Sequence, residues 1–185
     1  MAAVAAIAAV ALLPASAGAK KSSGTTLTVK KTGGTTLKVD GGTAKALTGL
    51  GISVSPIQPA KSTANGVRFP ITGGKLNSKT LAGYIKHSGG LRFSNGTTNV
   101  DLTKFTINID AAPDLVASVG GSRVSILSLD LSNMKNKSKG KSIKLSGVKA
   151  SLTAGAAGAL NQAFNTTAFT EGLVLGAASV KTTVK

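Results

Sequence analysis

The chain of 185 residues contains no Cys and no Trp, and it has one Tyr and one His. Without Cys, no disulfide stabilises the fold, and a Cys nucleophile or a His/Cys zinc cluster is excluded. Aromatic residues make up 3% of the chain. This scarcity argues against binding of single-stranded nucleic acid, because such proteins stack bases on aromatic side chains. The sequence therefore offers few side chains from which to build a catalytic centre.

Acidic residues are also scarce, and their spacing does not indicate an active site. Of the six Asp and Glu, Asp110 and Asp114 are the near neighbours, and Pro113 between them favours a turn over a rigid carboxylate pair. A Ser-His-Asp triad would need His87, and no G-x-S-x-G segment presents a nucleophilic Ser. The glycine pairs fit no phosphate-binding G-x-x-x-x-G-K-[ST] motif. We therefore predict a non-catalytic protein with no catalytic residues and no metal site.

Long hydrophobic runs are absent beyond the N-terminus. Residues 1–19 carry no charge, consist mostly of Ala, Val, Ile and Leu, and end in small-x-small sites that follow Pro14. This pattern is typical of an export signal cleaved near residue 19, and the run is too short to span a bilayer comfortably. We predict a signal peptide at 1–19, one β-rich domain at 20–185 and no membrane span in the mature chain. Export without Cys favours a secreted or wall-associated bacterial protein.

A strong positive charge is what the mature chain does have. All 22 Lys and Arg and all 6 acids follow residue 19, so the formal charge of +16 belongs to the mature chain. Such a charge favours anionic partners such as cell-wall polymers or lipid head groups. The run 134–144 places lysines at alternate positions, namely Lys135, Lys137, Lys139 and Lys141. Either a solvated hairpin tip that turns at Gly140 or a patch for anionic polymers explains this spacing.

Alternating polar and apolar residues predict strands through most of the chain. Two similar segments, 24–30 and 34–40, predict a hairpin that turns at Gly33 and Gly34. Helices are expected after Thr43, ending near Gly51, and at 154–164 after the capping residue Thr153.

In three predicted strands the apolar positions slip by one residue, which a β-bulge or a short turn accommodates. The slips fall between Leu102 and Phe105, between Ile126 and Leu127, and between Leu145 and Val148. Bent strands are typical of two packed sheets. The predicted fold is all-β: a β-sandwich of antiparallel strands with bulges and two short helices.

The stretch 66–110 holds the single His and the single Tyr. Ile85, His87 and Phe93 share one parity and Tyr84 has the other, so His87 points with the aliphatic residues and Tyr84 points away. Two interpretations of His87 remain open: a hydrogen-bonded core residue, or a ligand-binding residue at the mouth of an apolar cleft. The candidate ligand-binding residues are His87 and Tyr84, although their opposite parity argues against one shared site.

The segment His87-Ser-Gly89-Gly-Leu91 resembles the His-x-Gly-x-Leu turn of HtaA-type domains, which occur in actinobacterial exported proteins. Residues 66–131 carry the resemblance, and the part that follows the turn reads RFSNGTTNVDLTKFTINI. The resemblance implies a β-sandwich that binds hemin at the cell surface, with a Tyr that ligates the iron and a His that supports this Tyr. His87 matches that His. The family's Tyr lies in an N-terminal segment that contains Trp, whereas this chain has no Trp and no Tyr before Tyr84.

These observations lead to two functional hypotheses. The first is an exported, non-catalytic envelope or extracellular binding or structural domain with anionic wall polymers as partners. The alternative is a hemin-binding, heme-uptake protein of the HtaA type with an altered set of iron ligands, for which heme would be the cofactor.

Overall fold

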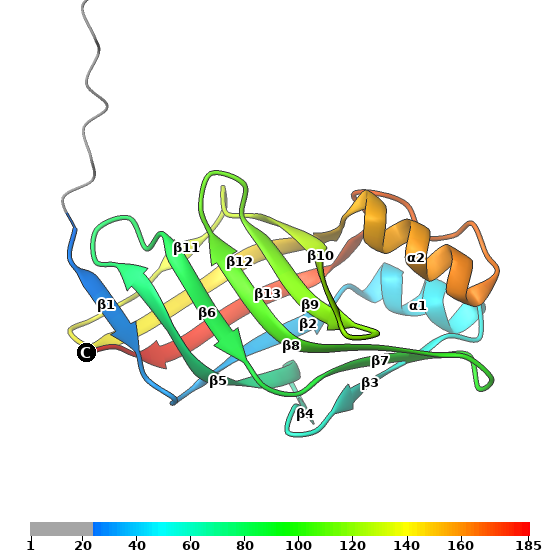
Figure 1. Cartoon of the computed structure of the whole chain (residues 1–185), viewed down its shortest axis with the longest axis horizontal. Helices are drawn as coiled ribbons and strands as arrows, with labels where there is room; N and C mark the ends of the chain where they lie inside the picture. Colours follow the sequence, from blue (N-terminus) through cyan, green and yellow to red (C-terminus); the bar gives the residue numbers. More distant parts are fainter. Residues whose placement is uncertain (1–23) are drawn as a thin grey trace, which may run out of the picture.

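The computed structural model describes residues 24–185, so the predicted signal peptide at 1–19 lies outside the described residues. The described part contains thirteen strands and two α-helices (Figure 1). In chain order they are β1 (Thr26–Val29), β2 (Gly34–Val39), α1 (Gly41–Gly49), β3 (Ser53–Ile57), β4 (Lys61–Thr63), β5 (Gly66–Asn77), β6 (Gly83–His87), β7 (Gly90–Ser94), β8 (Asn99–Ile109), β9 (Asp114–Val119), β10 (Ser122–Asp130), β11 (Lys135–Asn136), β12 (Ser142–Leu152), α2 (Ala154–Phe164) and β13 (Val174–Thr183).

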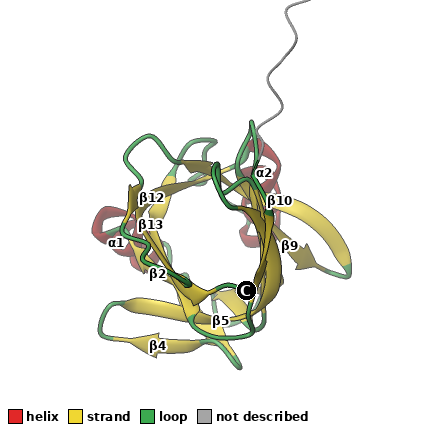
Figure 2. Cartoon of the chain, turned by 90° about the vertical axis from the view of Figure 1, so that its left-hand side faces the viewer, coloured by secondary structure: helices red, strands yellow, loops and turns green. Residues whose placement is uncertain are grey.

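Eight antiparallel strands close into a barrel, seen end-on in Figure 2. Their order around the wall is β5-β2-β13-β12-β10-β9-β8-β6, and β6 pairs with both β8 and β5. That double pairing removes the free edges that two separate sheets would have. Strand β7 continues from β6 along β8 and carries β3 on its outer edge. The two helices lie at the end of the barrel opposite the C-terminus (Figure 1).

The predicted all-β class is confirmed, but the predicted β-sandwich is wrong because the structure is a closed barrel. The error has a physical cause. In both architectures one face of each strand is buried and the other is solvated, so alternation along the sequence is the same. Only the pairing of the first and last strands of the wall distinguishes a barrel from two packed sheets.

The hairpin predicted from the two similar N-terminal segments is also wrong. Strands β1 and β2 do not pair with each other but lie in line along the long strand β5. Thr26 lies opposite Asn77 at one end of β5, and Leu37 lies opposite Val67 at the other. Each copy of the repeat therefore finds its hydrogen bonds on a common partner that follows more than 20 residues later in the sequence.

The three predicted slips in parity are confirmed as register shifts. They occur between Thr103 and Thr106 of β8, between Ser125 and Leu127 of β10, and between Leu145 and Val148 of β12. Bulges increase local twist and bend the strand. In this fold they help the wall to curve into a barrel while the apolar residues stay inside.

The second helix is confirmed with its cap, and the first begins earlier than predicted. Helix α2 spans Ala154–Phe164, and the Thr153 side chain accepts a hydrogen bond from the amide of Ala156. Helix α1 is capped by Asp40, whose carboxylate accepts bonds from the amides of Gly42 and Thr43. Thr43, the predicted cap, is instead buried and donates its hydroxyl to the carbonyl of Val174. Neither helix in the described part is long and apolar enough to cross a membrane.

Candidate functional site

His87 lies at the end of β6 and points into the barrel, with 5% of its surface exposed. Ile85 is buried on the same face, whereas Tyr84 and Lys86 lie on the outer face, where Tyr84 is partly exposed. The opposite orientations inferred from parity are thereby confirmed. The structure does not bring His87 and Tyr84 into one site, because the wall of the barrel separates them.

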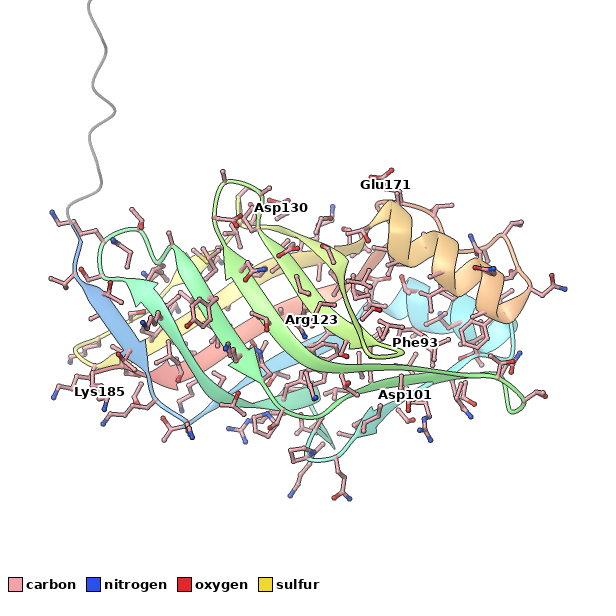
Figure 3. All side chains as sticks on the ribbon, viewed as in Figure 1. Phe93, Asp101, Arg123, Asp130, Glu171 and Lys185 are labelled. Atoms are coloured by element: carbon pink, nitrogen blue, oxygen red, sulfur yellow. The ribbon has the colours of Figure 1, made fainter. Side chains whose placement is uncertain are left out.

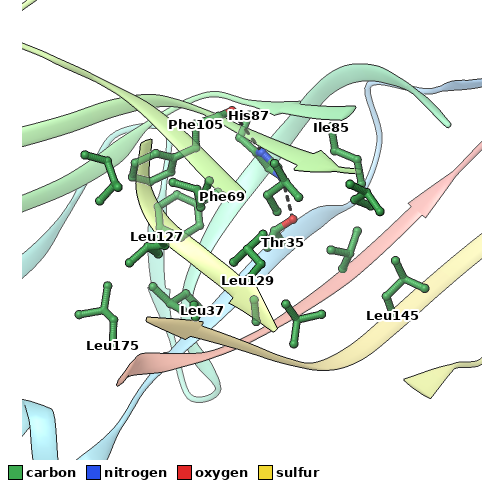
Figure 4. Close-up of a pocket in the computed structure, with 18 of the residues that line it drawn as sticks. Thr35, Leu37, Phe69, Ile85, His87, Phe105, Leu127, Leu129, Leu145 and Leu175 are labelled. Carbon is green, nitrogen blue, oxygen red and sulfur yellow. Dashed lines mark hydrogen bonds between the residues drawn. The ribbon is translucent and has the colours of Figure 1, made fainter. Parts of the chain in front are cut away.

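Both ring nitrogens of His87 have hydrogen-bond partners inside the barrel (Figure 4). The distance from Nδ1 to the carbonyl oxygen of Phe105 is 3.3 Å, and the distance from Nε2 to Oγ1 of Thr35 is 2.7 Å. A carbonyl only accepts, so Nδ1 carries the proton and donates it to Phe105. In the neutral ring Nε2 then accepts from the Thr35 hydroxyl. The lone pair with which a histidine would bind a metal is therefore already engaged.

Burial lowers the pKa of His87 to about 4, and the hydrogen bond with the Phe105 carbonyl opposes this shift. The cause is desolvation, because the charged imidazolium would lose its hydration inside an apolar barrel. At neutral pH His87 is consequently uncharged, which matches its pair of neutral partners.

The barrel interior around His87 is almost filled. A cavity of about 50 Å³ remains, and its wall is formed by aliphatic and aromatic side chains together with Thr35 and His87. Phe69 and Phe105 meet edge to face next to this histidine, with ring centroids 5.0 Å apart. Pockets for drug-sized ligands have volumes of roughly 300–1,000 Å³. The interior therefore does not fit hemin, and His87 does not face an open cleft.

Tyr84 lies on the outer wall among basic side chains. Lys86 places its Nζ 5.4 Å from the centroid of the Tyr84 ring. Lys75 is directly opposite Tyr84 on β5, and Asn108 is opposite it on β8. Within residues 24–185 no hydrogen bond engages the phenol oxygen of Tyr84.

The four lysines predicted as an anionic-polymer patch lie on an exposed hairpin. Strand β11 pairs with β12, and Lys139 and Ser142 bridge the turn that contains Gly140. The exposed lysines are Lys135, Lys137, Lys139 and Lys141. This placement confirms the predicted hairpin tip that turns at Gly140.

A second basic region, which the sequence did not indicate, lies on the outer wall of β5, β2, β13 and β12. It is a groove of about 480 Å³ whose lining includes Lys38, Arg68, Lys144 and Lys181. Lys144 ends the lysine-rich run 134–144, but Lys38, Arg68 and Lys181 lie far from it in the sequence, so no local charge run marks the groove as a whole. Only the pairing of the four strands brings them together.

The acidic residues have separate structural roles. Arg92 and Asp101 form a two-pronged ion pair across β7 and β8, with N–O distances of 2.7 and 2.6 Å. This pair lowers the pKa of Asp101 through its hydrogen bonds. Figure 3 places Asp101, Asp130 and Glu171 at different parts of the surface. Within the described residues, no group of three His, Cys, Asp or Glu could hold a metal ion.

Solved structures similar to this barrel include domains of HtaA and the heme-binding protein HtaB, all from Corynebacterium glutamicum. The C-terminal domain of HtaA has 18% sequence identity and a TM-score of 0.65, and the match covers 86% of this chain and 99% of that domain. The chain has the fold of an HtaA domain. The N-terminal domain of HtaA is similar to this HtaA-type barrel with a TM-score of 0.56, 14% identity and coverage of 84% and 99%. The heme-binding protein HtaB gives a TM-score of 0.53, 13% identity and coverage of 87% and 96%.

No family model and no curated protein matches the sequence. The resemblance noted at His87–Leu91 is instead confirmed by the three-dimensional similarity to the HtaA and HtaB structures. The turn of the HtaA-type barrel requires glycine at Gly89, where φ is +80° and a Cβ would lie 2.5 Å from the backbone nitrogen of Ala60. Ser88 and Gly89 form the link between β6 and β7, so the motif joins the two segments that pair along β8.

Proposed function

We propose that this protein is a non-catalytic hemin-binding protein that acts outside the cell. The observation that carries the proposal is the match of almost the whole barrel to the C-terminal domain of HtaA and to the heme-binding protein HtaB. This likeness supports the hemin hypothesis better than the broader hypothesis of an envelope binding or structural domain. The export-type segment at 1–19 supports a secreted or wall-associated location.

The chemistry of the side chains supports Tyr84 as the residue that contacts the hemin iron in this proposal. Heme iron is ligated in proteins by His, Cys, Met or Tyr. Cys is absent, His87 is buried with its Nε2 engaged, and Met134 is partly buried against the core. Tyr84 presents a phenol oxygen at the outer wall without a protein partner.

The basic residues around Tyr84 suit the remainder of the ligand. Hemin carries two propionate groups, and Lys75 and Lys86 lie beside Tyr84 on the same outer face. Lysine binds carboxylates as a flexible point charge. A hemin whose iron contacts Tyr84 would therefore lie on the wall formed by β5, β6 and β8 rather than inside the barrel.

A hemin titration of wild type and Tyr84→Phe tests this proposal. The substitution keeps the ring and removes the only oxygen that can bind iron at this position. We expect wild type to give a saturable shift of the Soret band, and the variant to bind at least about tenfold more weakly, a loss of about 1.4 kcal/mol. The melting temperature of the ligand-free variant should stay unchanged, because no protein hydrogen bond is removed.

Lys61→Gln is a suitable control, because Lys61 lies on β4 outside the Tyr84 surface. The substitution removes one positive charge and leaves the phenol unchanged. Equal hemin affinity of wild type and Tyr84→Phe would exclude Tyr84 as the iron contact. Failure of wild type to bind hemin saturably would reject the proposed function itself.

We also propose that the lysine-rich hairpin attracts the protein to anionic wall polymers. The exposed side chains of Lys135, Lys137, Lys139 and Lys141 and the overall charge of +16 support this proposal. Retention on isolated cell walls should fall as salt rises, because the Debye length shortens from about 10 Å at 0.1 M to about 3 Å at 1 M. Changing the four lysines to Gln should reduce retention at low salt in the same way. Retention that neither treatment alters would contradict an electrostatic role of the hairpin.

A further inference from the structure

The groove on the outer wall of β5, β2, β13 and β12 has the composition of an anion-binding site. It measures about 480 Å³, and its charged lining residues are Lys38, Arg68, Lys144 and Lys181. The strands β12, β13 and β2 that form most of it lie side by side in Figure 2. The groove is separate from the Tyr84 surface and is independent of the hemin proposal.

Small residues form the centre of the groove and long cationic side chains surround it. Thr36 and Ser179 lie opposite each other in the middle, and Gly34 and Ala177 lie on either side of this pair. Lys181 is opposite Gly34, and Lys38 is opposite Ala177. The small side chains therefore leave a depression in the outer wall, and the long cationic side chains surround this depression with positive charge.

Arg68 lies at the edge of this hollow. It lies opposite Thr36 on β5, and a Cβ added to Gly34 would be 2.9 Å from the Nε of Arg68. The Arg68 side chain therefore extends over Gly34, toward the strand that carries Lys181. Any larger residue at Gly34 would occupy the space that the guanidinium now uses.

The register places like charges directly opposite one another on both sides of the groove. Lys144 faces Lys181 across β12 and β13, and Lys61 faces Arg68 across β4 and β5. Opposed like charges on neighbouring strands destabilise a sheet. An anion bound between the two pairs would relieve this repulsion. The opposed cations therefore favour the binding of an anion in the groove.

No acid neutralises this cluster within residues 24–185. The groove lining contains no Asp or Glu, and no hydrogen bond or ion pair engages the side chains of its four cations. Asp40 caps α1, Asp101 pairs with Arg92, and Asp114 accepts from Asn108. The hydroxyls of Thr36 and Ser179 are likewise without protein partners in this part of the chain.

We propose that the groove binds a multiply charged phosphate anion. Arginine matches phosphate oxygens with its two-pronged fork, lysines add point charges, and the two hydroxyls supply short donors at the floor. A single carboxylate would satisfy only part of this set. The phosphate could belong to a free oligophosphate or to the phosphodiester chain of a wall polymer, and both sources share the same recognition chemistry.

Titration calorimetry with tripolyphosphate at about 0.15 M salt, where the Debye length is about 8 Å, tests the site. One variant changes Lys38, Arg68, Lys144 and Lys181 to Gln. The matched control changes Lys31, Lys45, Lys104 and Lys185 to Gln; these exposed lysines are not part of the groove lining, so the control removes the same charge from other places. We expect the groove variant to bind about tenfold more weakly or worse, equivalent to about 1.4 kcal/mol, and the control to stay within about twofold of wild type.

An Arg68→Lys variant keeps the charge and removes the fork, and we expect it to bind with an affinity between those of wild type and the groove variant. A parallel titration with poly(glycerol phosphate) distinguishes the two phosphate sources. If this polymer binds more tightly per site than tripolyphosphate, the ligand of the groove is a phosphodiester polymer and not a free oligophosphate. Equal weakening in the groove variant and the control variant would show unspecific attraction and overturn the proposal, as would no binding by wild type. An unchanged circular-dichroism spectrum of the groove variant verifies that it is folded, and this control does not depend on the outcome of the hemin proposal.

Discussion

Acidification from pH 7 to pH 4 is expected to lower the free energy of unfolding by about 3 kcal/mol through His87 alone. In the folded barrel burial lowers the pKa of His87 to about 4, against an ordinary value of 6.5 for histidine. The unfolded chain therefore binds more protons than the folded chain between these two values. The stabilising contribution is complete above about pH 6.5, falls as the pH decreases, and is lost near pH 4.

Denaturant unfolding at several pH values measures this effect, and a His87→Gln variant isolates it. Carboxylates such as Asp101 and Asp130, whose pKa values are lowered by hydrogen bonds, also destabilise the fold as they become protonated at lower pH. Their effect is common to both proteins, so the difference between wild type and variant reports His87. A difference that stays constant from pH 7 to pH 4 would show that the histidine is not buried as a neutral residue.

The second large effect is expected from His87→Ala at neutral pH, where the free energy of unfolding should fall by about 1–3 kcal/mol. The substitution removes the acceptor of the Thr35 hydroxyl and the donor to the Phe105 carbonyl. Both groups are then left inside an apolar barrel, where an unsatisfied polar group costs its full desolvation energy. The missing ring also enlarges the cavity of about 50 Å³.

Thermal melts of wild type and His87→Ala, each with and without hemin, separate a structural role from ligand binding. If His87 has a structural role, the His87→Ala substitution lowers the melting temperature with and without hemin, and the hemin-induced increase in melting temperature stays intact. Thr35→Val provides the matched control, because it keeps the shape of the partner and removes only its hydroxyl. An unchanged melting temperature of the ligand-free His87→Ala variant, together with a lost hemin effect, would instead assign His87 to the ligand.

Local features of the fold could be predicted because short-range physics produces them. The parity of Ile85 and His87 fixed which side chains point inward, since neighbours on a strand alternate between its faces. Helix α2 was predicted with its cap because the Thr153 hydroxyl satisfies an amide three residues later. The cap of α1 was missed because Asp40 and Thr43 are both good capping residues. The contact of Thr43 with the Val174 carbonyl, which only the folded chain provides, occupies its hydroxyl.

Features that depend on distant partners were decided by the tertiary structure. Closure of the barrel rests on the pairing of β6 with both β5 and β8, and alternation along one strand cannot specify it. The Thr35–His87 hydrogen bond joins residues 52 positions apart, so the sequence left the role of this histidine open. The cations of the outer groove come from four strands, and their proximity is a consequence of register. The sequence by itself determined which residues face inward and where strands bend, because those properties are local. The closure of the barrel, the partners of His87 and the outer groove were decided by the tertiary structure, because they depend on long-range strand pairing.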